Sequence, residues 1–256
     1  RQAFQVLGLL LLAITVPCAL LVVNHPHDRG LHADGAAEES PALKSARDAP
    51  PVSAAEVLTD PTFWLGVGVF GVVTSGMKGM VTNLAPFAID NGMTPTAAAG
   101  MISIYASAGL VSKGIFALIS DRISPRILMF VSLGGFGAGM ACLTQTHLGF
   151  NVMLTGLLLV GLFGGMMVGM QAFLMPRIFG EHVVGKAFGL MSSVTMLALM
   201  ATPALFGLIY DRTGSYAAIF YAFAGLAAAA MLGVMAMRLH PRKQSTAGEA
   251  AAVPAE

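Results

Sequence analysis

Residues 127–176 read ILMFVSLGGFGAGMACLTQTHLGFNVMLTGLLLVGLFGGMMVGMQAFLMP, and these 50 residues contain no Lys, Arg, Asp or Glu. As a single α-helix the stretch would extend about 75 Å, whereas roughly 20 apolar residues suffice to cross a bilayer. The polar segment Thr144-Gln145-Thr146-His147, followed by Gly149, interrupts the apolar run near its middle. The stretch therefore predicts two membrane-spanning helices joined by a short turn.

The composition of the whole chain agrees with a membrane protein. Of its 256 residues, 56% are hydrophobic and only 11% are charged, whereas soluble domains carry about 25% charged residues. The 14 basic and 13 acidic residues give a net charge of +1 with no sustained basic run, which argues against a nucleic-acid partner. Cys18 and Cys142 lie in separate apolar runs, so we interpret both as buried thiols rather than as disulfide partners or metal ligands.

Five further apolar runs are each long enough to cross a bilayer. The first could instead be a signal peptide, but it holds 20 residues without a charge and no small-residue cleavage site follows Val23. Together with the two helices above, the sequence predicts seven spans and an all-α fold, a polytopic membrane helical bundle. The five runs cover residues 4–23, 62–86, 96–120, 187–210 and 216–237.

Lysine and arginine are divided unequally between the two sets of loops, and cytoplasmic loops carry the excess. One set contains ten of these residues, whereas the other contains only Arg1 and Arg212. We therefore expect residues 24–60, the turns at 121–126 and 176–186 and the C-terminal tail to be cytoplasmic, so that the chain begins outside. The ten residues are Arg29, Lys44, Arg47, Arg122, Arg126, Arg177, Lys186, Arg238, Arg242 and Lys243.

Composition divides the chain into four parts. A transmembrane helix at 1–23 is followed by a proline-containing segment at 24–60, which lacks an apolar period and predicts a flexible linker. Residues 61–240 form the predicted six-helix bundle, and the Ala- and Glu-rich residues 241–256 are expected to be a disordered tail. No metal site is predicted, because a metal needs a more fixed geometry than the linker gives its clustered histidines, His25, His27 and His32.

Glycines recur at intervals of four in both helices of the quoted stretch. Gly135 and Gly139 lie in the first helix, and Gly161, Gly165 and Gly169 lie in the second. Small residues at this spacing let helix backbones approach closely in lipid, so helix packing is the preferred interpretation of both groups.

Two lysines lie inside predicted spans, where a charge near the centre costs roughly 2.5 to 3.5 kcal/mol and is usually retained for function. Both Lys78 and Lys113 lie away from the centre of their spans. The alternative to a functional role is therefore that each side chain extends along the helix and places its amine at the lipid headgroups. At 100° per residue each lysine shares a helix face with small and polar residues, which favours a water-filled cavity. These residues are Gly71, Thr74, Ser75, Thr82 and Ala85 for Lys78, and Ala106, Gly109, Ala117 and Ser120 for Lys113.

No Asp or Glu lies within a predicted span, since Asp90 and Asp121 mark helix ends and Asp211 belongs to an external turn. The two lysines therefore need an anion from elsewhere. An acidic residue in another part of the protein or the solute itself can supply it, and an anionic solute is the simpler hypothesis.

The turn Asp121-Arg122-Ile123-Ser124-Pro125-Arg126 resembles the cytoplasmic D-R-x-G-R signature of the major facilitator superfamily, with Ala117 and Ser124 in place of the usual glycines. Three other segments agree with that family in order and spacing. They are Pro26-His27-Asp28-Arg29-Gly30-Leu31 with Asp34-Gly35, then Arg177-Ile178-Phe179-Gly180 with Gly185 and Gly189, and finally Pro203 and Gly207 with Asp211-Arg212-Thr213-Gly214-Ser215-Tyr216.

The resemblance implies that the seven spans are helices six to twelve of a twelve-helix transporter, so the missing partner is an N-terminal helical bundle. The loop and eleventh-helix patterns are nearest to the monocarboxylate and oxalate/formate carrier branches. Lys113 stands where those carriers place a cationic side chain that meets the substrate carboxylate, although Gly109 and Gly114 replace an aspartate and a proline of the monocarboxylate pattern.

The resemblance and the residues together predict a secondary transporter that moves a small organic anion by alternating access. Lys113 and Lys78 would attract the anion, and Asp121, Arg122 and Arg126 would form a cytoplasmic latch. No cofactor is expected, and a coupling proton is a candidate partner. We expect a multi-pass protein of a bacterial inner (cell) membrane. The residues expected to donate or accept hydrogen bonds to the solute are Ser75, Asn83, Tyr105 and Gln171.

Three alternatives are weighed against this hypothesis. A transporter of a neutral or drug-like solute, or a membrane sensor that keeps the fold without transport, would have the same helices. An intramembrane enzyme is not expected, because no histidine lies within a predicted span and Ser75 lacks the G-x-S-G context of a serine nucleophile.

Overall fold

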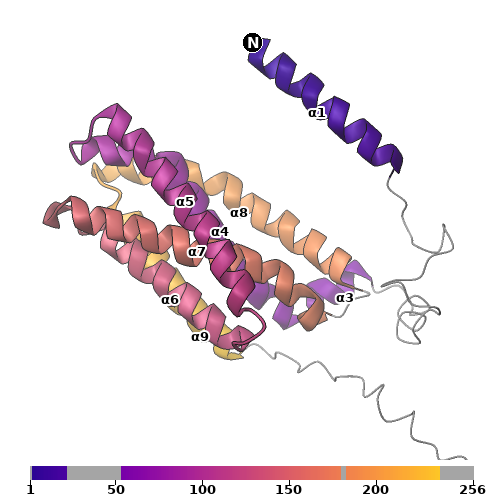
Figure 1. Cartoon of the computed structure of the whole chain (residues 1–256). Helices are drawn as coiled ribbons and strands as arrows, with labels where there is room; N and C mark the ends of the chain where they lie inside the picture. The colour runs from indigo at the N-terminus through magenta and orange to yellow at the C-terminus, as the bar shows by residue number, and fades with distance from the viewer. Residues whose placement is uncertain (1, 22–52, 180–182, 237–256) are drawn as a thin grey trace, which may run out of the picture. The chain divides into compact units, whose positions relative to one another are not determined.

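The computed structural model describes residues 2–21, 53–179 and 183–236. The chain divides into two units, Arg1–Pro50 and Pro51–Glu256, which we describe separately. The described part of the first unit is helix α1 (Gln2–Leu21), which contains Pro17. The described part of the second unit is also helical, so the all-α prediction is confirmed (Figure 1).

The described part of the second unit contains six long helices, and with α1 they give seven helices long and apolar enough to cross a membrane. The seven predicted spans are thus confirmed among the described residues. The turn predicted inside the uncharged stretch contains the short 3-10 helix η3 (Thr146–Leu148). The long helices are α4 (Pro61–Asp90), α5 (Pro95–Ile119), α6 (Pro125–Leu143), α7 (Phe150–Phe179), α8 (Val184–Thr213) and α9 (Ala217–Ala236).

Helix ends follow local capping chemistry. Asp60 and Thr94 precede the N-terminal prolines of α4 and α5, and their side chains accept hydrogen bonds from first-turn backbone N–H groups. The predicted linker 24–60 differs from expectation at its end, where a capping box between Ser53 and Glu56 starts the short helix α3 (Ala54–Thr59). The rest of that linker and the predicted tail lie outside the described residues.

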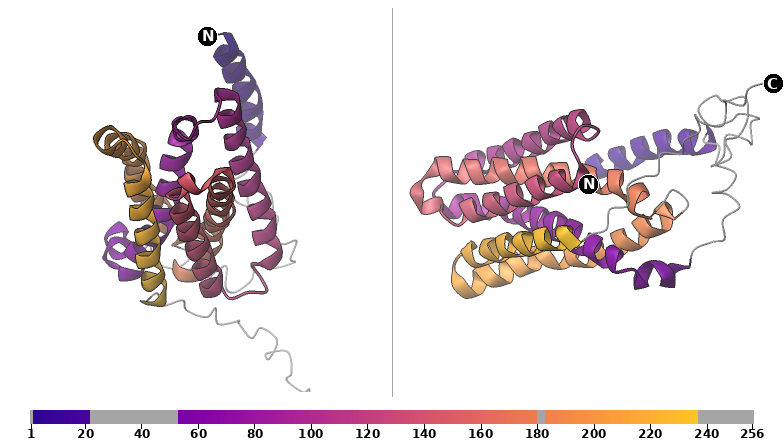
Figure 2. Two further views of the ribbon diagram at one scale, coloured as in Figure 1. Left: turned by 90° about the vertical axis from the view of Figure 1, so that its left-hand side faces the viewer. Right: turned by 90° about the horizontal axis from the view of Figure 1, so that it is seen from below.

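Helices α4 to α9 form one bundle in which α7 packs on α5 and α6, α4 packs on α8, and α9 packs on α6 and α4 (Figure 2). The glycines spaced by four make these contacts close. A Cβ placed at Gly139 would lie 2.9 Å from the Gly156 carbonyl oxygen, and one at Gly165 would lie 3.1 Å from the Gly109 backbone. The packing role predicted for these glycines is confirmed.

The core of the bundle is aromatic and methionine-rich. Phe206 of α8 is fully buried, and its ring centroid lies 5.8 Å from those of Phe220 and Phe223 on α9. The expected burial of both thiols is wrong: Cys18 is exposed on α1 and Cys142 is only half-buried on α6, because each lies on a face that its own unit does not cover.

Candidate functional site

Lys78 lies on an exposed arc of α4. On one side of this arc Met77 packs against Gly164 of α7, and on the other Gly79 packs against Thr202 of α8. Because successive residues of a helix are 100° apart, the Lys78 side chain leaves α4 midway between these two contacts. The bundle therefore holds the amine on the face of α4 that lies between α7 and α8.

The depth of Lys78 differs from the sequence-based expectation. Helix α4 continues to Asp90, four residues beyond the predicted end at 86, which moves the helix midpoint toward the lysine. At 1.5 Å per residue Lys78 lies about 4 Å from that midpoint and about 18 Å from the Asp90 end. With α4, about 45 Å long, centred on a hydrocarbon core of roughly 30 Å, Lys78 lies about 11 Å from the nearer edge of that core. This distance exceeds the length of a lysine side chain, so the alternative of an amine that reaches the headgroups is weakened for Lys78.

Lys113 is exposed on α5, at the flank of the face that packs on α7. The preceding residue, Ser112, is fully buried and donates a hydrogen bond to the Leu162 carbonyl oxygen of α7. Lys113 lies about 27 Å along α5 from Pro95 and about 9 Å from Ile119. Lys113 is therefore nearer than Lys78 to the predicted cytoplasmic side. For Lys113 both interpretations stay open, an amine in a water-filled cavity and an amine that extends to the headgroups.

Two of the polar residues assigned to the solute are engaged in helix contacts. Ser75 is buried, and its hydroxyl donates to the Gly71 carbonyl oxygen at 2.5 Å, one turn earlier in α4. The amide nitrogen of Asn83 donates to the Gly79 carbonyl oxygen at 2.9 Å and to that of Pro203 on α8 at 3.5 Å. Asn83 therefore links α4 to α8.

The other two assigned residues are half-buried. The Gln171 amide nitrogen lies 3.5 Å from the Met191 sulfur, which joins α7 to α8. Tyr105 of α5 packs against Gly161 of α7. The structure brings these residues to the inner contacts of the bundle, whereas the two lysines stay on uncovered arcs.

The predicted latch lies at the turn between α5 and α6. Asp121 and Arg122 are exposed in this turn, and Arg126 is on the first turn of α6. An aromatic contact that the sequence analysis missed joins α5 to α7 at the same end: Phe116 and Phe173 meet edge to face, and the Arg177 guanidinium lies 3.8 Å from the Phe173 ring centroid. Such a cation–π contact stabilises the helix ends by about 0.5–1 kcal/mol at an exposed site.

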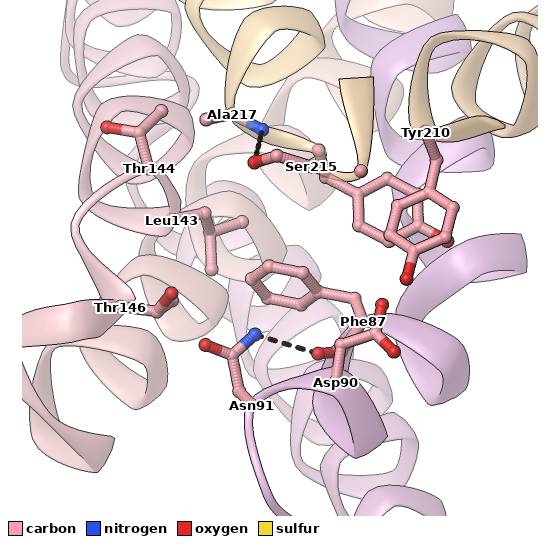
Figure 3. Close-up of a pocket in the computed structure, with 11 residues that line it drawn as sticks. Phe87, Asp90, Asn91, Leu143, Thr144, Thr146, Tyr210, Ser215 and Ala217 are labelled. Atoms are coloured by element: carbon pink, nitrogen blue, oxygen red, sulfur yellow. Dashed lines mark hydrogen bonds between the residues drawn. The ribbon is translucent and has the colours of Figure 1, made fainter. Parts of the chain in front are cut away.

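A pocket of about 180 Å³ lies at the opposite end of the bundle, and sequence reasoning did not predict it (Figure 3). The C-terminus of α4, the α6–α7 turn and the α8–α9 turn form its walls. Tyr210 lies close to Asp90, and its ring stacks on Tyr216 with centroids 4.6 Å apart. Its lining residues are Phe87, Asp90, Asn91, Leu143, Thr144, Thr146, Tyr210, Gly214, Ser215, Tyr216 and Ala217.

Aromatic packing and one charge shape this pocket. Phe87 meets the Tyr216 ring edge to face at 5.8 Å. Burial, and then the negative charge of Asp90, raise the pKa of the Tyr216 phenol. The only sequence signals for this pocket were the helix end at Asp90 and the Asp211-to-Tyr216 turn, and neither indicated that the two come together.

Comparison with known proteins finds two relatives that are named as transporters. The chain is 26% identical over 165 residues to monocarboxylate transporter 12-B of Danio rerio, an alignment that covers 63% of this chain and 34% of that protein. It is 32% identical over 145 residues to the putative transporter AraJ of Escherichia coli K12, which covers 56% of this chain and 34% of the relative. The alignments thus span about a third of the length of either relative.

A family model for the Major Facilitator Superfamily matches residues 73–255. The match covers the bundle from the middle of α4 onward, including both lysines, the α5–α6 turn and the pocket. The chain therefore belongs to the Major Facilitator Superfamily.

Proposed function

We propose that this chain is the C-terminal portion of a secondary transporter that moves a small organic anion across a bacterial inner membrane by alternating access. An N-terminal helical bundle is the proposed partner, because substrate sites in such transporters form between two repeats near the bilayer midplane. A coupling proton is part of the proposal, whereas no cofactor and no enzymatic step are.

The observation that carries the proposal is the position of Lys78. Its amine leaves α4 near the helix midpoint, on an arc that the described bundle does not cover. A charge at this depth is costly in lipid, and a water-filled cavity with an anion removes that cost. Lys113 is the second cation on an uncovered arc, and the name of the Danio rerio relative supports a carboxylate as the solute.

The polar residues have two roles in this proposal. Tyr105 and Gln171 are half-buried, so a movement of α5 or α7 can expose their polar groups to the solute. Ser75 and Asn83 instead help to hold α4 in place through the Gly71 and Pro203 carbonyl oxygens. Their contribution to solute binding is therefore weaker in this proposal than that of the lysines.

Asp121, Arg122 and Arg126 form the proposed cytoplasmic latch. Their exposure at the end of the bundle leaves the carboxylate and the Arg122 guanidinium accessible to a neighbouring helix end. Ionic contacts at such a site are worth about 0.2–1 kcal/mol each, which is enough to bias a two-state equilibrium without locking it.

Uptake of labelled lactate, pyruvate, formate and oxalate into vesicles that carry the complete protein tests the proposal. Removing a charge-assisted contact costs about 1.5–3 kcal/mol, so Lys113→Gln and Lys78→Gln should each lower uptake efficiency about 10- to 100-fold. Lys113→Arg and Lys78→Arg keep the charge and should retain more uptake than the glutamine variants.

The outcomes separate the proposal from its alternatives. Saturable uptake of an anion that depends on either lysine supports an organic-anion transporter. Uptake of neutral solutes alone would favour the neutral-solute alternative, and binding of a solute without any flux would favour a sensor.

A further inference from the structure

The pocket at the C-terminal ends of α4, α6 and α8, which are the predicted external ends and give it the name outer pocket, has the chemistry of a cation site. Asp90 is exposed at the pocket and supplies a full negative charge, and no Lys or Arg is among its 11 lining residues. The hydroxyl groups of Thr144, Thr146 and Ser215 add polar atoms around the opening. A solute anion would meet only repulsion from Asp90, so this pocket is not a second copy of the lysine site.

Aromatic rings in the pocket also favour a cation. Tyr210 and Tyr216 stack at 4.6 Å, and Phe87 lies edge to face against Tyr216. Aromatic faces attract a cation that lies within about 6 Å of the ring centroid. The raised pKa of the Tyr216 phenol, caused by burial and then by the Asp90 charge, agrees with a negative potential inside the pocket.

The type of cation follows from the charge and the volume. A divalent metal ion is usually held by more than one carboxylate, whereas this pocket has only Asp90 among its lining residues. A volume of about 180 Å³ exceeds what a bare ion needs. A primary ammonium group, with three N–H donors and a short organic body, matches one carboxylate, several oxygen acceptors and aromatic walls.

We propose that this outer pocket binds a small primary ammonium compound, with its N–H donors on the Asp90 carboxylate and its organic part against Phe87 and Tyr210. In Figure 3 the two threonines of the α6–α7 turn face Asp90 and Tyr210 across the Phe87 ring. Binding does not depend on the solute bound at the lysines, because it uses none of those residues.

Binding of labelled ethanolamine to the complete protein in nanodiscs, measured by scintillation proximity, tests the proposal at neutral pH. Ethylammonium should compete for the site, whereas ethylene glycol and glycolate, which have similar size but are neutral or anionic, should not. Sodium chloride at the same concentration controls for a simple effect of ionic strength.

Asp90→Asn removes the charge with little change in shape and should weaken ethanolamine binding about tenfold or more. Asp211→Asn is the matched control, because Asp211 is exposed on the neighbouring α8 turn and does not line the pocket. If Asp90→Asn does not fold, Tyr210→Leu removes one aromatic wall of the pocket and should weaken binding about threefold.

Saturable binding that follows this order of competitors, and that falls in Asp90→Asn but not in Asp211→Asn, supports the proposal. The proposal is overturned by an absence of saturable binding, by equal competition from ethylene glycol, or by equal losses in the two asparagine variants. Unchanged binding in Tyr210→Leu overturns it where Asp90→Asn cannot be measured. None of these results bears on anion uptake, which the lysine variants test separately.

Discussion

Replacing Gly139 with alanine should destabilise the bundle at the contact between α6 and α7. The new Cβ would lie 2.9 Å from the Gly156 carbonyl oxygen and 2.8 Å from a Val160 methyl carbon, well inside ordinary van der Waals contact. One of these neighbours is backbone, which cannot rotate away as a flexible side chain can. The helices must therefore separate by several tenths of an ångström along their most extensive contact.

The magnitude follows from two opposing effects. Overpacking in a well-packed core costs typically about 1–3 kcal/mol, whereas replacing glycine by alanine inside a helix gains up to about 1 kcal/mol. Taken from the middle of the overpacking range, about 2 kcal/mol, the net loss in the free energy of unfolding is about 1–2 kcal/mol. Gly134→Ala, on the same helix, is the control: its new Cβ would meet only a Met231 methyl carbon at 3.9 Å, so it should be neutral or slightly stabilising.

Thermal unfolding of the purified variants in one detergent, followed by circular dichroism, measures this difference. About 2–4 °C per kcal/mol is typical for a domain of this size, so Gly139→Ala should unfold about 2–8 °C below the parent protein. Gly134→Ala should unfold at or above the parent temperature. A Gly139→Ala variant as stable as Gly134→Ala would refute the close packing of α6 on α7.

Three further results are expected. Ser75→Ala should leave anion uptake within about twofold of the parent, because its hydroxyl is bonded within α4; a loss as large as that of Lys113→Gln would return Ser75 to the solute site. Asp121→Ala should change the ratio of inward to outward states by up to about fivefold, and unaltered cysteine accessibility on both faces would count against the latch. The pKa of the Tyr216 phenol is raised above 10.0 in the folded protein, so the folded state holds this proton more tightly than the unfolded state does. The resulting contribution to stability is complete below pH 10.0 and is lost as the pH rises through the folded-state pKa. Tyr216→Phe should therefore flatten the alkaline fall in the unfolding temperature.

The helices could be predicted from the sequence because charge and length decide them in lipid. Each span has too few charges to be exposed to water and enough residues to cross, and the break at Thr144 to Gly149 adds a turn. The residues at which the helices begin and end were less predictable from the sequence. The capping box at Ser53 created a helix inside an expected linker, and α4 continued beyond Pro86 to Asp90, because a proline deep in an apolar helix does not have to end it.

The candidate site was predictable only in part, because helical periodicity gives a face but not what covers it. The face of Lys78 also contained Ser75, yet the structure buries Ser75, one turn from the α8 contacts of Gly71 and Gly79, and leaves Lys78 exposed. The outer pocket depends on Asp90 meeting Tyr210, which is 120 residues later in the chain. No local pattern contains a contact of that range.

The small residues of α4 connect the packing of the bundle to the position of its charge. Gly76 lets α4 approach Phe136 of α6 and Phe223 of α9, and Gly79 lets it approach Phe206 of α8. A larger residue at either position would push α4 out or rotate it, and a rotation of one residue moves Lys78 by 100° into a neighbouring helix. The glycines therefore fix the direction of the amine, so a variant such as Gly79→Ala should affect solute binding as well as stability, although Gly79 itself is buried against α8.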